Sequence, residues 1–383
     1  MPSIARLAAY FFRLGALGFG GPIALANAMR RDLVEERAWL TAEEYEDGLA
    51  LAAACPGPLA YQLAVYCGYI RRGVAGGLAV AVAFALAPFL LVLAVAALYQ
   101  RFAATWQLRA LFYGIAPAVV ALIVRACWNL GRKTLRTDVR AWLFFTIACA
   151  VTVVVEREIA WMFIIAGLLG ALVFGERAAE GAGAPLSAGA PLRAIIFPLY
   201  GGTTSKLFLF FFKTGLLVFG SGLVIVPFLK AQVVDEYHWL TNHQFLDAVA
   251  IGMISPGPVV ITATFVGYIL DGVAGALAAT LGIFTPPVLF VLCATPILLR
   301  YRNNARLRGF VRGVGTAVVG VLVGTTWLIA RVAIGDALTI AVALLSVAAL
   351  ARWRKLPEPV VIAAAAIVGL IAYPLLQPQW VLR

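Results

Sequence analysis

Residues 54–60 read Ala-Cys-Pro-Gly-Pro-Leu-Ala, and residues 254–260 repeat the pattern as Ile-Ser-Pro-Gly-Pro-Val-Val. Each Pro-Gly-Pro lies inside an apolar stretch, 48–70 or 248–270, where proline and glycine must interrupt a helix. The two copies lie 200 positions apart, and the same offset recurs well outside the tripeptide. The chain therefore contains an internal repeat.

The repeat covers both halves of the chain. With a shift of 200, residues 11–58 meet an identical residue at Phe11, Phe12, Gly15, Leu17, Phe19, Gly20, Val34, Glu36, Trp39, Leu40, Thr41, Asp47, Ala50, Pro56, Gly57 and Pro58. Beyond Gln62 the shift becomes 199 and pairs Pro88 with Pro287 and Gly114 with Gly313. We expect a first repeat at 1–175, a Gly/Ala/Pro-rich linker at 176–205 and a second repeat at 206–383.

The composition is that of a membrane protein. Of the 383 residues, 63% are hydrophobic and 13% charged, and the mean hydropathy is +0.96, which excludes an ordinary soluble enzyme and a disordered regulator. The net charge of +12 is attributed to basic loops on the cytoplasmic side of the membrane, because cytoplasmic loops of membrane proteins are rich in Lys and Arg. A nucleic-acid partner is not expected.

Few residues offer catalytic or metal chemistry. The five cysteines include no Cys-x-x-Cys pair, and the two histidines, His238 and His243, do not have the spacing of a metal-binding helix. No compact group of nucleophile, acid and base is visible. We expect no cofactor, no metal site, no catalytic residue and no enzymatic activity.

Long uncharged runs predict membrane crossings. A helix needs about 20 apolar residues to cross about 30 Å of hydrocarbon. Residues 74–100 and 273–299 contain no charged residue and are predicted to span. Shorter apolar runs lie at 110–124, 141–155, 159–175, 313–330, 337–351 and 359–382.

The beginning of each half differs, because its apolar stretches are broken. Residues 14–29 contain Gly-Phe-Gly-Gly-Pro and residues 214–229 contain Phe-Gly-Ser-Gly, ahead of the two Pro-Gly-Pro segments. Interrupted helices at matching places in two halves indicate the binding site of a transporter. The sequence predicts an all-α polytopic membrane protein with Gly/Pro-broken helices or re-entrant hairpins at its core.

The charges predict that the halves are inverted. Arg71-Arg72 of the first half corresponds to Leu270-Asp271 of the second, whereas the arginine-rich loop at 300–312 corresponds to a loop with only two arginines. Inversion requires an odd number of crossings per half. We therefore expect 14–29 and 214–229 to be hairpins and 48–70 and 248–270 to span. The loop containing Arg30, Arg31 and Arg37 opposes this arrangement, because it would then lie outside.

Helix termini at the breaks predict an anion site. A proline at the start of a helix leaves the next amide hydrogens without partners, and the helix dipole adds positive charge there. Glycine allows close approach to those amides. The alternative is a plain kink or close helix packing. The expected contributors are Pro56, Gly57, Pro58, Leu59, Ala60, Ser255, Pro256, Gly257, Pro258, Val259 and Val260 at one pair of breaks, and Phe19, Gly20, Gly21, Pro22, Phe219, Gly220, Ser221 and Gly222 at the other.

One cation precedes each Gly-rich break. Arg13 and Lys213 occupy matching positions, and an intramembrane cation is costly unless it has a partner or a function. An arginine can bind two oxygens of a tetrahedral oxyanion, and a lysine acts as a point charge. The alternative is that both side chains extend to the membrane interface.

Two matched carboxylates precede the Pro-Gly-Pro segments. Asp47 and Asp247 are candidate coupling carboxylates that could carry a proton or pair with a cation. The alternative is that each interacts with a helix dipole from the first turn. Ser255 stands where the first half has Cys55, so the two breaks are not equivalent.

These motifs together resemble the long-chain, two-domain members of the chromate ion transporter family. The resemblance rests on Phe-x-Arg/Lys-x-Gly at 11–15 and 211–215, Gly-Phe-Gly-Gly-Pro at 18–22, Trp-Leu-Thr at 39–41 and 239–241, and the two Pro-Gly-Pro segments. It covers essentially the whole chain. The family positions it marks are 19–22, 56–58, 219–220 and 256–258, and Ser221-Gly222 departs from the Gly-Pro of the first half.

The resemblance implies chromate efflux across the bacterial inner membrane, which gives chromate resistance. Sulfate is a related tetrahedral anion, so a sulfate or other oxyanion uptake carrier is the alternative, with a membrane-embedded enzyme less favoured. We expect the oxyanion to sit between facing helix termini while the inverted halves rock. The expected partners are the chromate or sulfate anion and the lipid bilayer. A homodimer is left open.

Overall fold

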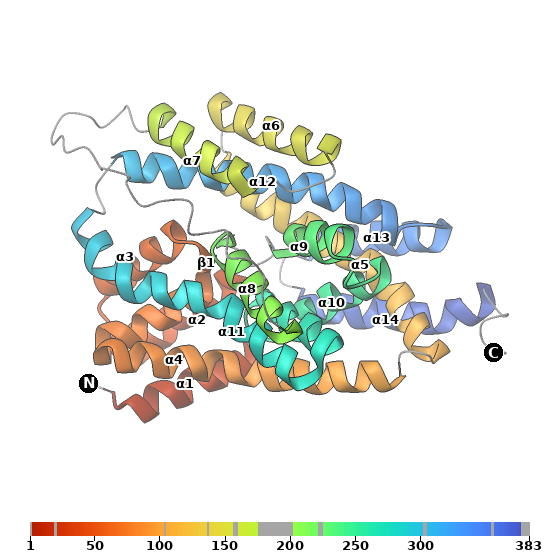
Figure 1. Ribbon diagram of the computed structural model, residues 1–383, viewed down its shortest axis with the longest axis horizontal. Coiled ribbons are helices and arrows are strands. Elements are labelled where there is room, and N and C mark those ends of the chain that lie inside the picture. The colour runs from red at the N-terminus through yellow and green to blue at the C-terminus, as the bar shows by residue number, and fades with distance from the viewer. Residues whose placement is uncertain are drawn as a thin grey trace.

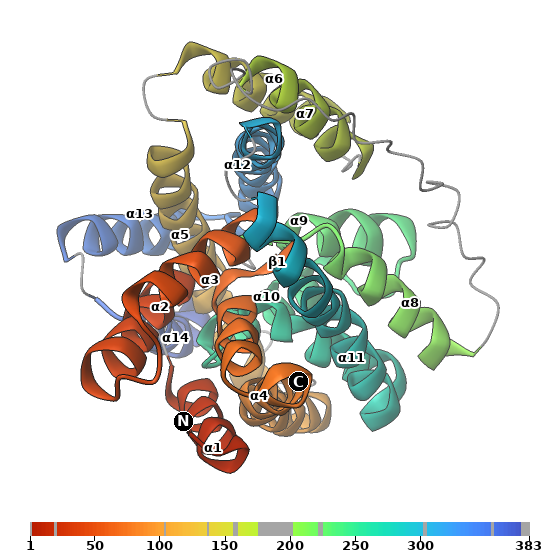
Figure 2. The ribbon, with the colours of Figure 1, turned by 90° about the vertical axis from the view of Figure 1, so that its left-hand side faces the viewer.

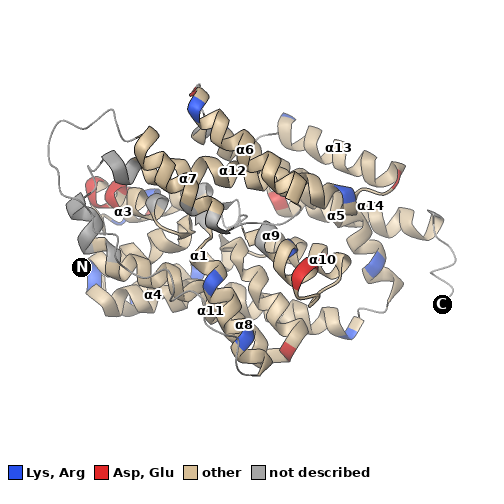
Figure 3. Ribbon diagram, turned by 45° about the horizontal axis from the view of Figure 1, so that its top comes forward, with Lys and Arg blue, Asp and Glu red and all other residues tan. Residues whose placement is uncertain are grey.

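The computed structural model describes residues 2–18, 21–102, 105–135, 138–155, 160–174, 202–220, 225–301, 305–353 and 356–376. They form a helical bundle in which helices of both halves surround a short pair of strands near the centre (Figures 1 and 2). Residues 74–100 of α4 and the whole of α7 carry no charged residue (Figure 3), as expected of segments in contact with lipid.

The described residues of the first half form nine elements in chain order. These are α1 (Ile4–Leu17), α2 (Gly21–Arg30), the π-helix η1 (Arg31–Glu36), α3 (Ala42–Ala54), β1 (Gly57–Pro58), α4 (Leu59–Phe102), α5 (Trp106–Thr134), α6 (Val139–Val155) and α7 (Ala160–Val173).

The second half follows a similar order, except that its strand lies at the Gly-rich break instead of at Pro-Gly-Pro. Its elements are α8 (Thr203–Gly215), β2 (Phe219–Gly220), α9 (Ile225–Phe228), the π-helix η4 (Leu229–Glu236), α10 (Asn242–Ile254), the 3-10 turn η5 (Val259–Ile261), α11 (Thr262–Tyr301), α12 (Ala305–Ala333), α13 (Ala337–Arg352) and α14 (Glu358–Leu376).

Each half begins with two helical hairpins whose tips are the broken segments. In the first hairpin, α1 and α2 turn back at the Gly-rich break, and the Tyr10 hydroxyl reaches the Asp32 carboxylate at 3.1 Å. In the second, α3 and α4 turn back at Pro-Gly-Pro. A Cβ on Gly48 would lie 2.3 Å from the Tyr66 ring, and Arg71 pairs with Glu44.

A further reversal divides α4 into two arms. Arg72 has a non-helical backbone and Gly73 has a φ of +60°, a conformation that favours glycine. The arms then lie so close that a Cβ on Gly68 would meet the Gly76 carbonyl oxygen at 2.5 Å. The second half repeats this turn at Asp271 and Gly272 in α11.

One sequence prediction about these segments is wrong. Residues 48–70 do not span, because the chain reverses at Pro-Gly-Pro, and 248–270 reverses likewise, with Gly252 packed on Thr262. The predicted hairpins at 14–29 and 214–229 coincide with reversals of the chain. The correction moves the loop at 31–41 to the same end of the molecule as Arg71, as the Arg71–Glu44 pair requires. Arg30, Arg31 and Arg37 therefore lie at the same end as Arg71 and Arg72, as the positive-inside rule favours.

Long apolar helices supply the crossings. Within the described residues, five helices are long and apolar enough to span: 59–102, 106–132, 259–293, 312–333 and 358–375. The predicted crossings at 74–100 and 273–299 form the second arms of α4 and α11. The apolar helices at 139–155 and 337–352 are shorter.

The long arms of α4 and α11 run in opposite directions. A Cβ on Gly77, near the start of the α4 arm, would lie 2.9 Å from a methyl carbon of Leu292, far along the matching arm of α11. Parallel arms would bring Gly77 to the start of the α11 arm instead. The two homologous halves are therefore an inverted repeat.

The later helices cross into the opposite half. α5 packs against α13 and α14, and α12 packs against α6 and α7. The contacts are reciprocal: Gly114 of α5 touches Gly369 of α14, and Gly313 of α12 touches Gly170 of α7. Reciprocal contacts of this kind are those of an approximate two-fold axis. Each half thus completes the packing of the other.

The division into two repeats stays a prediction. α8 begins at Thr203, within the last residues of the predicted linker at 176–205, and residues 176–201 lie outside the described part.

Candidate functional site

The tips of the four hairpins meet at the centre of the molecule, each against a tip of the opposite half. β1 pairs with β2 in parallel, and the Gly57 amide donates to the Val218 carbonyl at 2.5 Å. At the matching place, the Gly257 amide donates to the Gly18 carbonyl at 3.0 Å. Each Pro-Gly-Pro tip therefore rests on the Gly-rich tip of the other repeat.

Glycine is required at both Pro-Gly-Pro tips. Gly57 has a φ of +141° and Gly257 a φ of +86°. A Cβ on Gly57 would lie 2.9 Å from the Pro287 ring, and one on Gly257 would lie 3.2 Å from the Pro88 ring. Pro88 and Pro287 are the pair matched by the repeat, so each proline supports the tip of the other half.

The amides predicted to bind an anion begin helices at these tips. α4 begins at Leu59, and the 3-10 turn that leads into α11 begins at Val259. Their first amides have no partner within the turn. Pro58 and Pro258 precede the helices instead of occupying their first position; Pro258 is an extended N-cap with φ −74° and ψ 131°. The predicted helix starts therefore move by one residue, from the prolines to Leu59 and Val259.

Several predicted residues have other positions or roles. Gly21 and Pro22 open α2, and Phe219 with Gly220 forms β2. Ser255 is the C-cap of α10, and its buried hydroxyl donates to the Gly252 carbonyl at 2.9 Å. Residues 19–20 and 221–224, which include Phe19, Gly20, Ser221 and Gly222, lie outside the described part.

Sequence reasoning missed Gln62 as a site residue. Its side chain is fully buried, and Nε2 donates to the Pro56 carbonyl at 2.6 Å, which fixes the tip. Its Oε1 is buried and has no hydrogen-bond partner among the described residues. Two features of the sequence could have identified it: Gln62 is a carboxamide side chain in an apolar stretch, and it lies where the offset between the two halves changes from 200 to 199.

The two cations stand on the helices that lead to the Gly-rich tips. Arg13 is exposed on α1, five residues before Gly18, and Lys213 is half-buried near the end of α8. Within the described part of the chain, neither side chain has a hydrogen bond or an ion pair. Both are available to an anion that approaches a tip.

The two matched carboxylates have different surroundings. Asp247 is only 9% exposed, and its carboxylate accepts a hydrogen bond of 2.7 Å from the Tyr99 hydroxyl of the other half. Asp47 is half-buried. Both lie in the second turn of helices that are capped by Thr41 and Thr241. The first-turn dipole interaction considered for them is therefore wrong.

The arrangement of the repeats and of their hairpin tips is typical of one class of protein. Two inverted repeats with interrupted helices meeting at the centre of a polytopic bundle are the architecture of a secondary transporter. Among the described residues, no group of His, Cys, Asp and Glu could hold a metal ion.

The comparisons give the family. The chromate transporter family model matches residues 5–171 and 205–370. A chromate transport protein of Cupriavidus metallidurans is 43% identical, covering 98% of this chain and 94% of that protein. A probable chromate transport protein of Synechococcus elongatus is 40% identical (96% and 95% covered), and a chromate transport protein of Pseudomonas aeruginosa is 35% identical (97% and 93% covered). No solved structure matches. The chain belongs to the chromate transporter family, and it is a multi-pass membrane protein of a transporter family.

Proposed function

We propose that this protein transports chromate across the bacterial inner membrane, in the outward direction, and thereby gives chromate resistance. The observation that carries the proposal is the central junction of four hairpin tips, formed by inverted halves in a chain of the chromate transporter family. Carriers place substrate at such interrupted helices.

The substrate site lies at the junction. The amides of Leu59 and Val259 begin helices there, so partial positive charge from two helix dipoles meets the doubly negative anion. Arg13 and Lys213 approach from the two Gly-rich hairpins and add full charges. A tetrahedral oxyanion with acceptors on every side suits this set of donors.

The membrane potential supports the outward direction, and the arginine distribution indicates which end of the protein faces the cytoplasm. Arg30, Arg31, Arg37, Arg71 and Arg72 lie at the end of the first half formed by the hairpin loops, and the positive-inside rule places that end in the cytoplasm. A cytoplasm-negative potential then favours exit of the dianion by about 2.3 kcal/mol per charge per 100 mV.

The packing changes the expected motion. Rocking of one half against the other would have to separate α5 from α13 and α14, and α12 from α6 and α7. We propose instead that the tips move within a frame of exchanged helices. The two tip contacts open alternately, one toward each side of the membrane.

Asp247 is the candidate for coupling to protons. A buried carboxylate whose described partner is a phenol, and not a cation, changes its charge at low energetic cost when water reaches it. Asp47 lacks this burial. We therefore assign the coupling role to Asp247 alone.

Flux measurements test the proposal. Inside-out membrane vesicles containing the protein should take up radiolabelled chromate when the interior is made positive, and empty vesicles should not. Arg13→Ala and Lys213→Ala should lower the rate at least 10-fold, since a hydrogen bond to an ion is worth about 1.5–3 kcal/mol. Unchanged rates in both variants would remove the cations from the site.

A sulfate uptake carrier is the second candidate, because the same donors fit sulfate. Vesicles that accumulate sulfate but not chromate would favour it. The family is one of transporters, and an embedded enzyme would instead convert a substrate without moving it. Cross-linking in native membranes tests the homodimer.

A further inference from the structure

A cationic cavity lies beside the first hairpin, away from the junction of the tips. It has a volume of about 330 Å³ and is lined by Tyr10, Arg13, Leu14, Leu17, Asp32 and Arg37. A water molecule takes up about 30 Å³ in the liquid, so the cavity can hold a tetrahedral oxyanion with part of its hydration shell. It is partly open to the outside of the protein.

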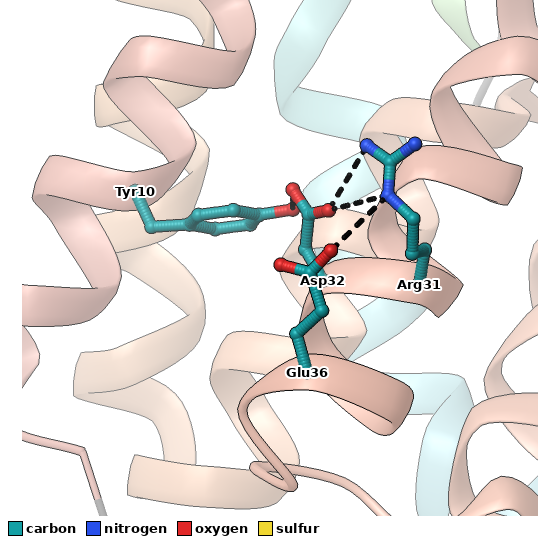
Figure 4. A network of polar contacts seen from close by, with 4 residues as sticks. All are labelled: Tyr10, Arg31, Asp32 and Glu36. Atoms are coloured by element: carbon teal, nitrogen blue, oxygen red, sulfur yellow. Dashed lines mark hydrogen bonds and ion pairs between the residues drawn. The ribbon is translucent and has the colours of Figure 1, made fainter.

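The single carboxylate of the cavity is already engaged. Asp32 accepts a hydrogen bond from Tyr10 at 3.1 Å and pairs with Arg31 at 3.2 Å (Figure 4). Arg31 also reaches Glu36 at 3.5 Å. Neither Arg13 nor Arg37 has a carboxylate partner in the described part of the chain. Two arginines therefore face the cavity with their charge uncompensated.

Arg37 is held in place by aromatic rings. Its guanidinium carbon lies 4.9 Å from the centre of the Tyr10 ring and 5.1 Å from that of Trp39. Stacking on ring faces holds the guanidinium plane and leaves its N–H edge available for hydrogen bonds. A preorganised donor of this kind suits a polyoxygen anion.

Helix α1 connects the cavity with the junction of the tips. Leu14 and Leu17 also line the cavity, and Gly18, which follows, accepts the hydrogen bond from Gly257 of the opposite tip. At 1.5 Å per residue, Arg13 lies about 7.5 Å along the helix from Gly18. An anion held by Arg13 and Arg37 would be one short step from the tips.

The described residues at the matching positions of the second half do not form an equivalent cluster of charges. Phe210, Gln232 and Tyr237 replace Tyr10, Asp32 and Arg37, and only Lys213 keeps a positive charge. There Tyr237 stacks on Trp239 at 4.8 Å, and Phe210 packs edge-on against both rings. Because the halves are inverted, the cationic cavity opens toward one side of the membrane and the aromatic cluster toward the other.

We propose that the cavity is a loading site for tetrahedral dianions, in which Arg13 and Arg37 capture the anion on the side of the 31–41 loop before it reaches the tips. The proposal rests on the proposed transport function and adds to it a separate binding site on one face. Anionic lipid headgroups share this chemistry, and we commit to the free oxyanion.

Chromate uptake into inside-out vesicles tests the loading site. The half-saturating concentration should rise about 10-fold in Arg37→Gln and in Arg13→Gln, the loss of one charged hydrogen bond. Arg37→Lys should recover part of the affinity. Arg6→Gln, which alters an exposed arginine on the same helix as Arg13 that does not line the cavity, should change it less than twofold.

Further measurements distinguish binding of the free oxyanion from binding of lipid headgroups. The shift in Arg37→Gln should persist in reconstituted vesicles of pure phosphatidylcholine; a shift seen only with anionic lipid would assign the cavity to headgroups and overturn the proposal. Equal half-saturating concentrations for the Arg37, Arg13 and Arg6 variants would also overturn it. If Arg37→Gln fails to reach the membrane, Arg37→Lys decides, because Arg37 lines the cavity and has no assigned role at the tips; a half-saturating concentration equal to that of the wild type would overturn the proposal. Absence of chromate flux in the wild type would instead refute the proposed function.

Discussion

At the scale of single residues, two glycines determine whether the tips can meet. Gly57 and Gly257 combine a positive φ with contact to a proline of the opposite half. The repeat identified both residues from the sequence, because Pro-Gly-Pro recurs. Their conformation and their contacts with Pro88 and Pro287 required the structure, since these contacts join residues that are far apart in the chain.

Replacement of Gly57 by alanine should destabilise the protein. The new Cβ would lie 2.6 Å from the Gln62 side chain and 2.9 Å from Pro287, in a backbone conformation that strains any residue with a Cβ. We expect a loss of about 2–4 kcal/mol and of transport. Gly73→Ala is the matched control, because Gly73 also has a positive φ but no atom within 4 Å of the added Cβ.

Thermal unfolding of the purified variants in detergent measures the difference. Gly73→Ala should lose only about 1–2 kcal/mol, the cost of the left-handed backbone alone. Equal losses in the two variants would mean that the tip tolerates a side chain and is not closely packed.

Asp247 should control the response of transport to a proton gradient. Asp247→Asn keeps the acceptor for the Tyr99 hydroxyl but cannot lose or gain a charge. We expect flux driven by membrane potential to continue, whereas stimulation by a pH gradient disappears. Asp47→Asn, at the matching position outside the buried pocket, should retain the stimulation; if both variants keep it, Asp247 carries no coupling proton.

At the scale of elements, the long helices were predictable and the reversals were not. Uncharged runs predicted the arms at 74–100 and 273–299, because burial in lipid requires a continuous apolar length. The same criterion failed for 48–70, where the apolar length is sufficient but folds back at Pro56–Pro58. Apolar residues buried inside the protein satisfy the same pattern as residues that cross the membrane.

Close helix contacts should tolerate no side chain at Gly114. A Cβ there would lie 2.1 Å from the Ala365 carbonyl oxygen, so Gly114→Ala must push α5 away from α14. We expect a loss of about 1–3 kcal/mol in thermal unfolding. Gly131→Ala on the same helix meets nothing closer than 3.6 Å and should be neutral or slightly stabilising; similar losses at both positions would contradict the close contact.

At the scale of the whole molecule, the exchange of helices makes each half incomplete. α5 and α12 each complete the packing of helices from the other repeat, and Arg312 of α12 pairs with Asp138 of the first half at 2.8 Å. The duplication predicted two similar halves. It could not predict this exchange, because a repeat in sequence is compatible with two separate bundles and with one interwoven bundle.

Division of the chain within the predicted linker tests this arrangement. Co-expressed fragments 1–175 and 176–383 should assemble and restore chromate transport, and neither fragment should do so alone. The control pair carries Gly313→Leu, whose side chain would collide with the Ala166 carbonyl of α7 and prevent assembly. Transport by a single fragment would mean that one half is sufficient.

The contact between the tips also fixes an energy scale for opening. Each side of the junction is closed by a backbone hydrogen bond, Gly57 to Val218 or Gly257 to Gly18, and such a bond is worth only about 0.5–1.5 kcal/mol in net terms. Breaking one of these hydrogen bonds therefore costs little while the other stays formed. Uncoupled leakage through the protein requires both tip contacts to be open at once, so it is rare. Opening one contact at a time needs no large input of energy in each transport cycle.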